Sequence, residues 1–198
     1  MNYVVFGATG RTGRFIAEGL IKAGHAVTAP GRRDPAIAGV TFRQTDLMDA
    51  VQVRAAVQGA DAAISALASD KGNPVCSTLA TALADIEVLR FVTIAGGGVD
   101  APGDNKGFMD KAIGWLMRRL VPAMLADRQR EFGILQSSRL RWTMIRPPML
   151  TDKPATGRWQ ITHDRPASKQ IARADLASAA IAIAADDALA RRAPFVAG

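Results

Sequence analysis

The 198-residue chain contains one cysteine, Cys76, and one tyrosine, Tyr3. A single cysteine excludes an internal disulfide and favours a reducing compartment. No charged segment precedes an apolar run at the N-terminus, and the longest apolar stretch, over residues 176–185, is too short to cross a bilayer. We therefore expect a cytoplasmic protein that does not contact a membrane. Cys76 itself is expected to act as a small apolar residue at the start of a helix.

Histidine is almost as scarce, with only His25 and His163 in the chain. Together with one cysteine, they form no cluster of metal ligands at a typical spacing, so we expect no metal site. His25 precedes a predicted strand and is expected at the surface. His163 lies in a late loop and could reach a substrate, although a lone loop histidine is most often only solvated.

Charge is in excess on the positive side, with 25 Lys and Arg against 18 Asp and Glu and a formal net charge of +7. A basic chain can bind nucleic acid or an anionic ligand, or can simply have a solvated basic surface. The arginines form only small clusters, at Arg32-Arg33, Arg118-Arg119 and Arg191-Arg192. Because no run reaches the length of a basic tail, we do not expect a nucleic-acid partner.

Short apolar runs alternate with helical patterns along nearly the whole chain. Strands are predicted over residues 3–6, 25–29, 40–43, 62–65, 90–94 and 142–146, with a last edge strand at Phe195 and Val196. Helices are predicted over residues 11–23, 46–57, 75–85, 108–120, 123–136 and 174–185, and residues 150–171 are expected to form loop and a short strand. This order predicts the α/β class: a Rossmann-type doubly wound parallel sheet in a single domain, 1–198, with substrate-side loops around 96–122 and 149–171.

Three glycines follow the first predicted strand directly, at the mouth of the first helix. Gly7, Gly10 and Gly13 are three residues apart. In a dinucleotide-binding loop such glycines permit the tight turn, the close approach of a pyrophosphate and the packing of the helix on the sheet. The helix N-terminus adds free N–H groups and partial positive charge. The alternating β and α context therefore predicts a dinucleotide site here, with Thr9, Arg11 and Thr12 in the same loop.

The end of the second strand decides which dinucleotide is favoured. An acid at this position binds the ribose 2′-hydroxyl of NAD, but residues 28–33 contain none and end in Arg32 and Arg33. Two guanidinium groups suit a 2′-phosphate, and Arg11 could reach the same phosphate. We therefore expect NADP(H) to be preferred, with NAD(H) as the alternative and solvated loop arginines as the simplest other role.

Two other acidic positions allow more than one role. Asp46 and Leu47, after the third strand, are expected beside the adenine, and Asp46 could also cap the next helix. Asp127 and Glu131 lie four residues apart on one predicted helix with Arg128 and Arg130 alongside, a pattern for which we expect surface ion pairs.

The carboxyl ends of the later strands should form the nicotinamide and substrate side. These ends are residues 65–67, 94–96 and 146–149, where small side chains leave room for a ring. The Tyr–Lys pair that donates a proton in many dehydrogenases is excluded, because the one tyrosine lies in the first strand. Hydride transfer does not require a strong protein acid, because the cofactor carries the reactive chemistry. Both a reductase without tyrosine and a protein that only binds the cofactor remain open.

These residues resemble the atypical short-chain dehydrogenases of the NAD(P)H-binding type, in particular the flavin reductase and biliverdin reductase B branch, with the NmrA-like regulators nearby. The resemblance is carried by VVFGATGRTGRFIAEGLIKAGHAVTAPGRR, GADAAISAL, RFVTIAGGG and LRWTMIRPPMLTDKPATGRWQI followed by ARADLASAAI. It covers most of the chain in order and is weaker from about residue 99 to 122. The glycine loop is common to many families, whereas its combination with RPPMLTD and TGRW is more specific.

The resemblance implies a Rossmann fold and NADPH-dependent reduction of a flavin, quinone or tetrapyrrole-like acceptor. It implies that the backbone from Gly7 to Gly13 holds the pyrophosphate, with Thr12 among the contacts, and that Arg32 binds the 2′-phosphate. It also implies the following contacts along the cofactor: Asp46 and Leu47 at the adenine, Ala66, Leu67, Ile94 and Ala95 along its length, and Pro147 and Pro148 beside the nicotinamide.

The substrate side departs from the biliverdin reductase pattern. That branch has a serine near the position of Gly96 and a histidine near that of Met149, so a tetrapyrrole substrate is in doubt. A flat apolar pocket formed by Gly96, Gly97 and Met149 would still suit a planar acceptor. The apolar side chains Phe108, Met109 and Trp115 could contribute to it, although a helical apolar stripe more often faces the core.

Our leading hypothesis is thus an NADPH-dependent reductase of a small planar acceptor. The alternative is a redox sensor of the NmrA kind, which binds NADP(H) and contacts a protein partner. A sugar-nucleotide epimerase or dehydratase fits poorly, because the chain lacks the catalytic tyrosine and a sizeable C-terminal substrate domain.

Overall fold

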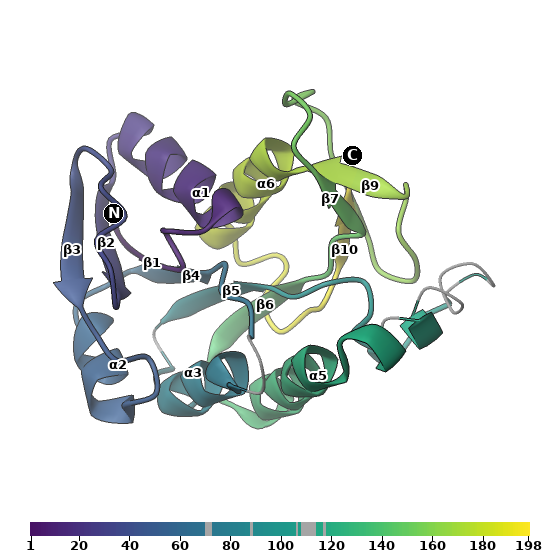
Figure 1. The fold of residues 1–198 in the computed structure, drawn as a ribbon, viewed down its shortest axis with the longest axis horizontal. Coiled ribbons are helices and arrows are strands. Elements are labelled where there is room, and N and C mark those ends of the chain that lie inside the picture. The colour runs from purple at the N-terminus through teal and green to yellow at the C-terminus, as the bar shows by residue number, and fades with distance from the viewer. Residues whose placement is uncertain (70–72, 88, 106, 108–113, 117) are drawn as a thin grey trace.

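Six parallel strands form the central sheet of the protein (Figure 1). The structure, a computed structural model, describes residues 1–69, 73–87, 89–105, 107, 114–116 and 118–198. The strands are β1 (Asn2–Phe6), β2 (Ala26–Gly31), β3 (Val40–Gln44), β4 (Ala62–Ser65), β5 (Arg90–Ile94) and β6 (Arg141–Ile145). They lie in the order β3-β2-β1-β4-β5-β6, which confirms the doubly wound Rossmann-type sheet.

Helices cover both faces of this sheet, which explains why the central strands β1, β4 and β5 are buried along nearly their whole length. In Figure 1, α1 (Arg11–Lys22) and α6 (Arg173–Ala185) lie above the sheet, and α2 (Ala50–Ala56), α3 (Val75–Leu83) and α5 (Pro122–Ser137) lie below it. Alternate residues of β1 enter the two cores. Tyr3 and Val5 pack with α1 and α6, whereas Val4 and Phe6 pack with the helices below. None of the described helices is long and apolar enough to cross a membrane.

The chain reverses the direction of its crossovers between β1 and β4. From β1 it runs outward through β2 and β3, then returns to place β4 on the other side of β1. At such a point the loops at the carboxyl ends of the two neighbouring strands diverge and leave a crevice. The glycine loop follows β1 immediately, so the fold places it at the edge of this crevice.

The C-terminal third adds two small sheets beside the substrate end. One pairs β7 (Met149–Thr151) in parallel with β9 (Gln170–Ala172), and the other pairs β8 (Gln160–Thr162) antiparallel with β10 (Phe195–Ala197). The region 150–171 is therefore richer in strand than predicted. The edge strand expected at Phe195 and Val196 forms, but β8 is its main partner, and only one parallel bridge joins Phe195 to Arg146 beyond β6.

The helix predicted from residue 46 begins at Ala50, which corrects the expected role of Asp46 as its cap. Asp49 is the N-cap: its Oδ1 accepts hydrogen bonds from the N–H groups of Val51 (2.8 Å) and Gln52 (3.3 Å). Asp46 instead accepts from the N–H of Met48 at 2.9 Å, in a turn before the helix. The other described helices and strands differ from prediction by at most two residues at each end.

The structure describes only part of the helix predicted over residues 108–120. Residues 108–113 and 117 lie outside the described residues, and Phe108 and Met109 are among them. Residues 114–116 and 118–120 are helical. Trp115 is 59% exposed, so it does not belong to the core.

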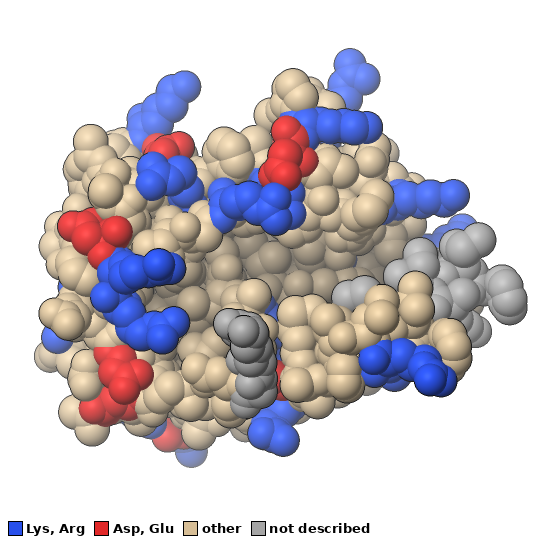
Figure 2. All heavy atoms as spheres, viewed as in Figure 1, with Lys and Arg blue, Asp and Glu red and all other residues tan. Residues whose placement is uncertain are grey.

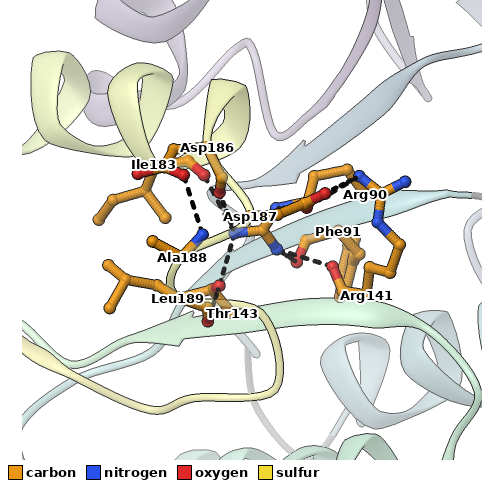
Figure 3. Close-up of polar contacts among 9 residues, drawn as sticks. All are labelled: Arg90, Phe91, Arg141, Thr143, Ile183, Asp186, Asp187, Ala188 and Leu189. Carbon is orange, nitrogen blue, oxygen red and sulfur yellow. Dashed lines mark hydrogen bonds and ion pairs between the residues drawn. The ribbon is translucent and has the colours of Figure 1, made fainter.

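The amino ends of β5 and β6 are joined to α6 by a buried arginine, Arg90 (Figure 3). Its Nη1 donates to the carbonyl oxygen of Arg141 at 2.7 Å, and its Nη2 donates to Thr143 Oγ1 at 2.7 Å. Nη2 also donates to the carbonyl oxygens of Ile183 (3.0 Å) and Asp186 (3.2 Å), where α6 ends. The guanidinium therefore adds donors to carbonyl groups at the end of α6, where the regular hydrogen bonding of the helix stops.

Candidate dinucleotide site

The glycine loop has a backbone that only glycine allows at two positions. Gly7 has a φ of +81°, and a Cβ there would lie 3.0 Å from the carbonyl carbon of Ala66. At Gly13 a Cβ would lie 2.0 Å from the carbonyl oxygen of Gly7, so the loop and the first turn of α1 are in direct contact. Gly10 closes the turn, and its N–H donates to the carbonyl oxygen of Gly7 at 2.9 Å.

The N-terminus of α1 is open to an anion. Its N-cap residue, Gly10, has no side chain to accept from the first-turn N–H groups, and the first turn contains no acidic residue. The first N–H groups of α1 therefore have no side-chain cap, and they lie at the positive end of the helix dipole. A close-packed glycine turn that ends in an uncapped helix fits the pyrophosphate of a dinucleotide.

A cavity of about 770 Å³ adjoins this loop. It lies at the carboxyl ends of β1, β2 and β3 and beside the segment after β4, and we call it the cofactor hollow. Figure 2 shows a hollow across this face, with Lys and Arg side chains gathered at its end near β2 and β3. The predicted site residues that line it are Gly7, Thr9, Arg32, Arg33, Asp46, Leu47 and Leu67. Residues that line it without having been predicted include Gln44, Thr45, Gln52 and Asn73.

Two arginines on the rim of the cofactor hollow have no partner within the described part of the chain. Arg32 and Arg33 are exposed, and neither has a hydrogen bond or ion pair with any other described residue. The nearby acid Asp34 directs its Oδ1 to the N–H of Ala36 at 2.8 Å, and Asp46 is held by Met48 as described above. Among the described residues, neither acid forms an ion pair with Arg32 or Arg33, so both guanidinium groups keep their donors available next to the end of β2.

Arg11 and the remaining loop residues occupy a different position. Arg11 forms an ion pair with Asp152 at 2.8 Å, and Asp152 also pairs with Arg173 at 2.7 Å, at the start of α6. Arg11 thus reaches toward the segment after β7 in this structure, whereas its expected role at the 2′-phosphate stays a prediction. Ala66 lies directly behind Gly7, as the contact at Gly7 shows.

The predicted nicotinamide side is formed by two strand ends that run side by side. The N–H of Ala95 donates to the carbonyl oxygen of Ile145 at 2.9 Å, and that of Gly97 donates to Pro147 at 2.8 Å. Gly96 has open space where a Cβ would lie, and Met149 is 65% exposed. These contacts bring together the residues predicted here, namely Ile94, Ala95, Gly96, Gly97, Pro147, Pro148 and Met149. None of these seven side chains titrates.

Below these strand ends, α5 contributes charged residues that we expected at the surface. That expectation is wrong: Asp127, Arg128 and Glu131 are 3%, 6% and 0% exposed. Arg128 Nη1 lies 2.7 Å from Glu131 Oε2, and Thr93 Oγ1 donates to Glu131 Oε1 at 2.8 Å. Burial acts to raise the pKa of Asp127, but hydrogen bonds from Ser69, Ser77 and Cys76 outweigh it and lower that pKa. A signal existed in the sequence, because residues 123–136 cover a sheet yet show no apolar stripe.

A second cavity, of about 640 Å³, lies beyond the edge strand β6, and none of the residues predicted to contact the cofactor or to form the acceptor pocket lines it. His163 lies on its wall and is exposed. Arg191, also on the wall, donates to the carbonyl oxygens of Gln136 (3.0 Å) and Ser138 (2.8 Å) at the end of α5. His25, expected at the surface, is half-buried, and its ring centroid lies 5.0 Å from that of Tyr3.

Comparisons with known proteins agree with this geometry. The anaerobillin reductase ChuY from Escherichia coli O157:H7 is 21% identical, covers 100% of this chain and 97% of its own, and superposes with a TM-score of 0.82. A candidate NADH-flavin reductase from Streptococcus pneumoniae is 21% identical, with 100% and 99% coverage and a TM-score of 0.78. A short-chain dehydrogenase/reductase from Veillonella parvula, in complex with NADP, is 19% identical, with 100% and 94% coverage and a TM-score of 0.81.

At these identities the three structures establish a common fold and no more. The family is established separately, because residues 7–187 match the model of the family described as NAD(P)H-binding. That match begins at the first glycine of the phosphate loop and ends just after α6. The chain therefore belongs to the NAD(P)H-binding family.

Proposed function

We propose that the protein is an NADPH-dependent reductase that transfers a hydride to a small planar acceptor, such as a flavin or a quinone. The observation that carries this proposal is the cofactor hollow, which is lined by the glycine loop that leads into the uncapped α1 and by two arginines that pair with no other described residue. The helix N-terminus suits a pyrophosphate, and the two arginines suit a further phosphate. NADP(H) carries both groups, whereas NAD(H) carries only the first and is the alternative cofactor.

Each predicted residue then has a role along the cofactor. The backbone from Gly7 to Gly13, including Thr9, Arg11 and Thr12, holds the pyrophosphate, and Arg32 binds the 2′-phosphate with support from Arg33. The remaining contacts, from adenine to nicotinamide, are Asp46, Leu47, Leu67, Ala66, Ile94, Ala95, Pro147 and Pro148. The bound nicotinamide supplies the hydride, and the protein supplies binding and orientation. Gly96, Gly97 and Met149 are proposed to receive the acceptor.

The class of acceptor follows from the side chains at the strand ends. No titrating group lies among the seven residues that form the nicotinamide side, so an acceptor that requires a protein acid is disfavoured. Flavins and quinones can take their proton from water once reduced, and a flat ring suits a site formed by glycine, alanine and proline. The names of two similar structures, an anaerobillin reductase and a candidate NADH-flavin reductase, also support reduction of a small molecule.

The proposal is tested by following NADPH oxidation with a free flavin and with a soluble quinone, in the presence and absence of the protein. We expect turnover above the uncatalysed rate with at least one of these acceptors, and a lower rate with NADH at the same concentration. Tight NADPH binding with no turnover across the acceptors would contradict the reductase. Equal rates with NADPH and NADH would contradict the cofactor preference.

The second candidate is a redox sensor of the NmrA kind, which would bind NADP(H) and contact a protein partner. It is favoured by the same lack of titrating side chains, and by the exposed apolar residues Trp115 and Leu120 near the substrate-side loops. Similar affinity for NADP⁺ and NADPH without turnover would support it. For either function we propose a cytoplasmic location, which the single free thiol of Cys76 supports.

A further inference from the structure

We propose that Asp127 and Arg128, two buried residues of α5, position the segment 66–69 that forms one wall of the cofactor hollow. They would thereby set cofactor affinity without touching the cofactor. The inference rests on the proposed function for its ligand, but the placement of the wall can be measured without any ligand.

Arg128 holds the wall from below through its guanidinium. Nη2 donates to the carbonyl oxygen of Leu67, and Nη1 donates to Thr93 Oγ1 at 3.3 Å while it pairs with Glu131. Thr93 belongs to β5, so one planar side chain connects α5, the sheet and the segment after β4. Only an arginine offers several donors in a fixed plane for this arrangement.

Asp127 holds the same segment and the start of α3. Its carboxylate accepts from Ser69 Oγ, from the N–H of Cys76 at 3.1 Å and from the N–H of Ser77 at 3.1 Å. The residue at the N-cap position of α3, Pro74, has no side-chain hydrogen bond to offer. Asp127 therefore caps α3 from another helix, and the negative charge is favourable at that N-terminus.

The wall held in this way contacts the phosphate loop directly. Leu67 and Ala68 line the cofactor hollow. A Cβ at Gly7 would lie 3.0 Å from the carbonyl oxygen of Ala66 and 3.1 Å from the nitrogen of Leu67, so there is no free space between the two segments. A displacement of Leu67 would thus change both the wall and the support behind Gly7.

Stability alone does not account for these buried charges. A buried ion pair can often be replaced by apolar side chains of similar volume with no loss of stability, because desolvation offsets the attraction between the charges. What an apolar pair cannot replace is the directed hydrogen bond to the carbonyl oxygen of Leu67. The distinctive effect of Arg128 should therefore appear in cofactor binding rather than in the free energy of unfolding.

The test compares the double variant Arg128→Met/Glu131→Leu with wild type and with Arg90→Met, which removes a buried arginine at the opposite end of the sheet. NADPH affinity is measured by fluorescence titration, and amide hydrogen exchange is measured without cofactor. We expect the double variant to bind NADPH about tenfold more weakly, the equivalent of one lost charge-assisted hydrogen bond. We also expect faster exchange over residues 66–69, whereas the N–H groups of residues 76 and 77, which Asp127 still holds, should exchange as in wild type. Arg90→Met should lose stability but keep its NADPH affinity.

A second variant, Arg128→Lys, tests the same inference if the double variant does not fold. Arg128→Lys keeps the charge beside Glu131, but its ammonium cannot serve Leu67, Thr93 and Glu131 in one plane, so its affinity should also fall. Unchanged affinity and unchanged exchange in the folded variants would overturn the inference. If wild type itself binds no NADPH, the proposed function fails. In that case hydrogen exchange decides the inference alone, and faster exchange at residues 66–69 still supports it.

Discussion

At the amino ends of the central strands Arg90 is buried and donates to main-chain carbonyl oxygens and to Thr143 (Figure 3), whereas at the carboxyl ends Arg32 and Arg33 extend from the rim of the cofactor hollow without a partner among the described residues. The buried arginine has lost most of its hydration, which lowers its pKa, and its hydrogen bonds offset that loss. The exposed pair keeps its hydration until a ligand arrives.

Burial and hydrogen-bond partners, rather than residue type, therefore distinguish structural arginines from ligand-binding ones. A guanidinium that already serves the end of α6 has few donors left for a ligand. One on an open rim contributes little to folding, because exposed charges interact weakly in water. The comparison therefore predicts that substitutions at the two ends of the sheet change different observables.

The largest effect is expected from Gly13→Ala, at the carboxyl end. A Cβ there would lie 2.0 Å from the carbonyl oxygen of Gly7, so the phosphate loop must move. We expect NADPH affinity to fall by about a hundredfold or more, equivalent to about 2.7 kcal/mol. Gly133→Ala in α5 is the matched control, because a Cβ there has open space and should stabilise the helix by about 0.5–1 kcal/mol. Equal effects of the two substitutions, in titrations and thermal unfolding, would contradict this account.

Arg90→Met should give the next largest effect, and it should act on stability alone. The substitution removes the guanidinium donors from carbonyl oxygens at the end of α6 and from Thr143, for a loss of about 2 kcal/mol in the free energy of unfolding. Arg141→Ala removes another arginine beside the same acid, Asp187, but its side chain is half-exposed, so we expect a loss of about 1 kcal/mol or less. Chemical denaturation measures both values. A large loss of NADPH affinity in Arg90→Met would contradict the inference that the amino ends of the strands affect stability and only the carboxyl ends affect cofactor binding.

A smaller effect on stability concerns Cys76, which lies beneath the carboxyl ends. Burial raises the pKa of the Cys76 thiol from 9.0 to about 12. Because the folded value is the higher one, this group contributes stability that is complete below pH 9.0 and is lost as the pH rises toward 12. At pH 8 the folded thiol should react with a disulfide reagent about a thousandfold more slowly than the unfolded thiol.

Labelling of Cys76 can also be measured in Arg90→Met, to test whether Arg90 affects only global stability. If that residue affects only global stability, labelling should accelerate by the factor by which the unfolded population increases. Rapid labelling in wild type at pH 8 would show instead that the region beneath the cofactor hollow opens locally.

The sheet and the glycine loop could be predicted because they depend on local and periodic features. Apolar runs such as residues 3–6 followed by a glycine, then a helical pattern, are typical of a buried strand and its crossover. Each of these patterns can be recognised within a few consecutive residues of the sequence. Right-handed connections restrict the possible topologies, whereas the strand order β3-β2-β1-β4-β5-β6 comes from the pairing of the strands in the structure.

The buried part of the site could not be predicted in the same way. Asp127, Arg128 and Glu131 have the spacing of surface ion pairs, and only their partners from β5, the segment after β4 and α3 show why they are buried. The start of α2 differs from the prediction for a related reason. Asp46 and Asp49 can both cap a helix, and only the path of the backbone determines that Asp49 does so. Contacts between distant segments are not encoded in the spacing of one segment.

The central claim is that the unpaired Arg32 beside the glycine loop binds a 2′-phosphate. Its most direct test is a set of four dissociation constants, for NADPH and NADH with wild type and with Arg32→Ala. A lost charge-assisted contact predicts that Arg32→Ala weakens NADPH binding by about 10- to 100-fold, leaves NADH binding unchanged and does not alter the free energy of unfolding. Equal weakening of both cofactors, or an unchanged NADPH constant, would contradict the claim.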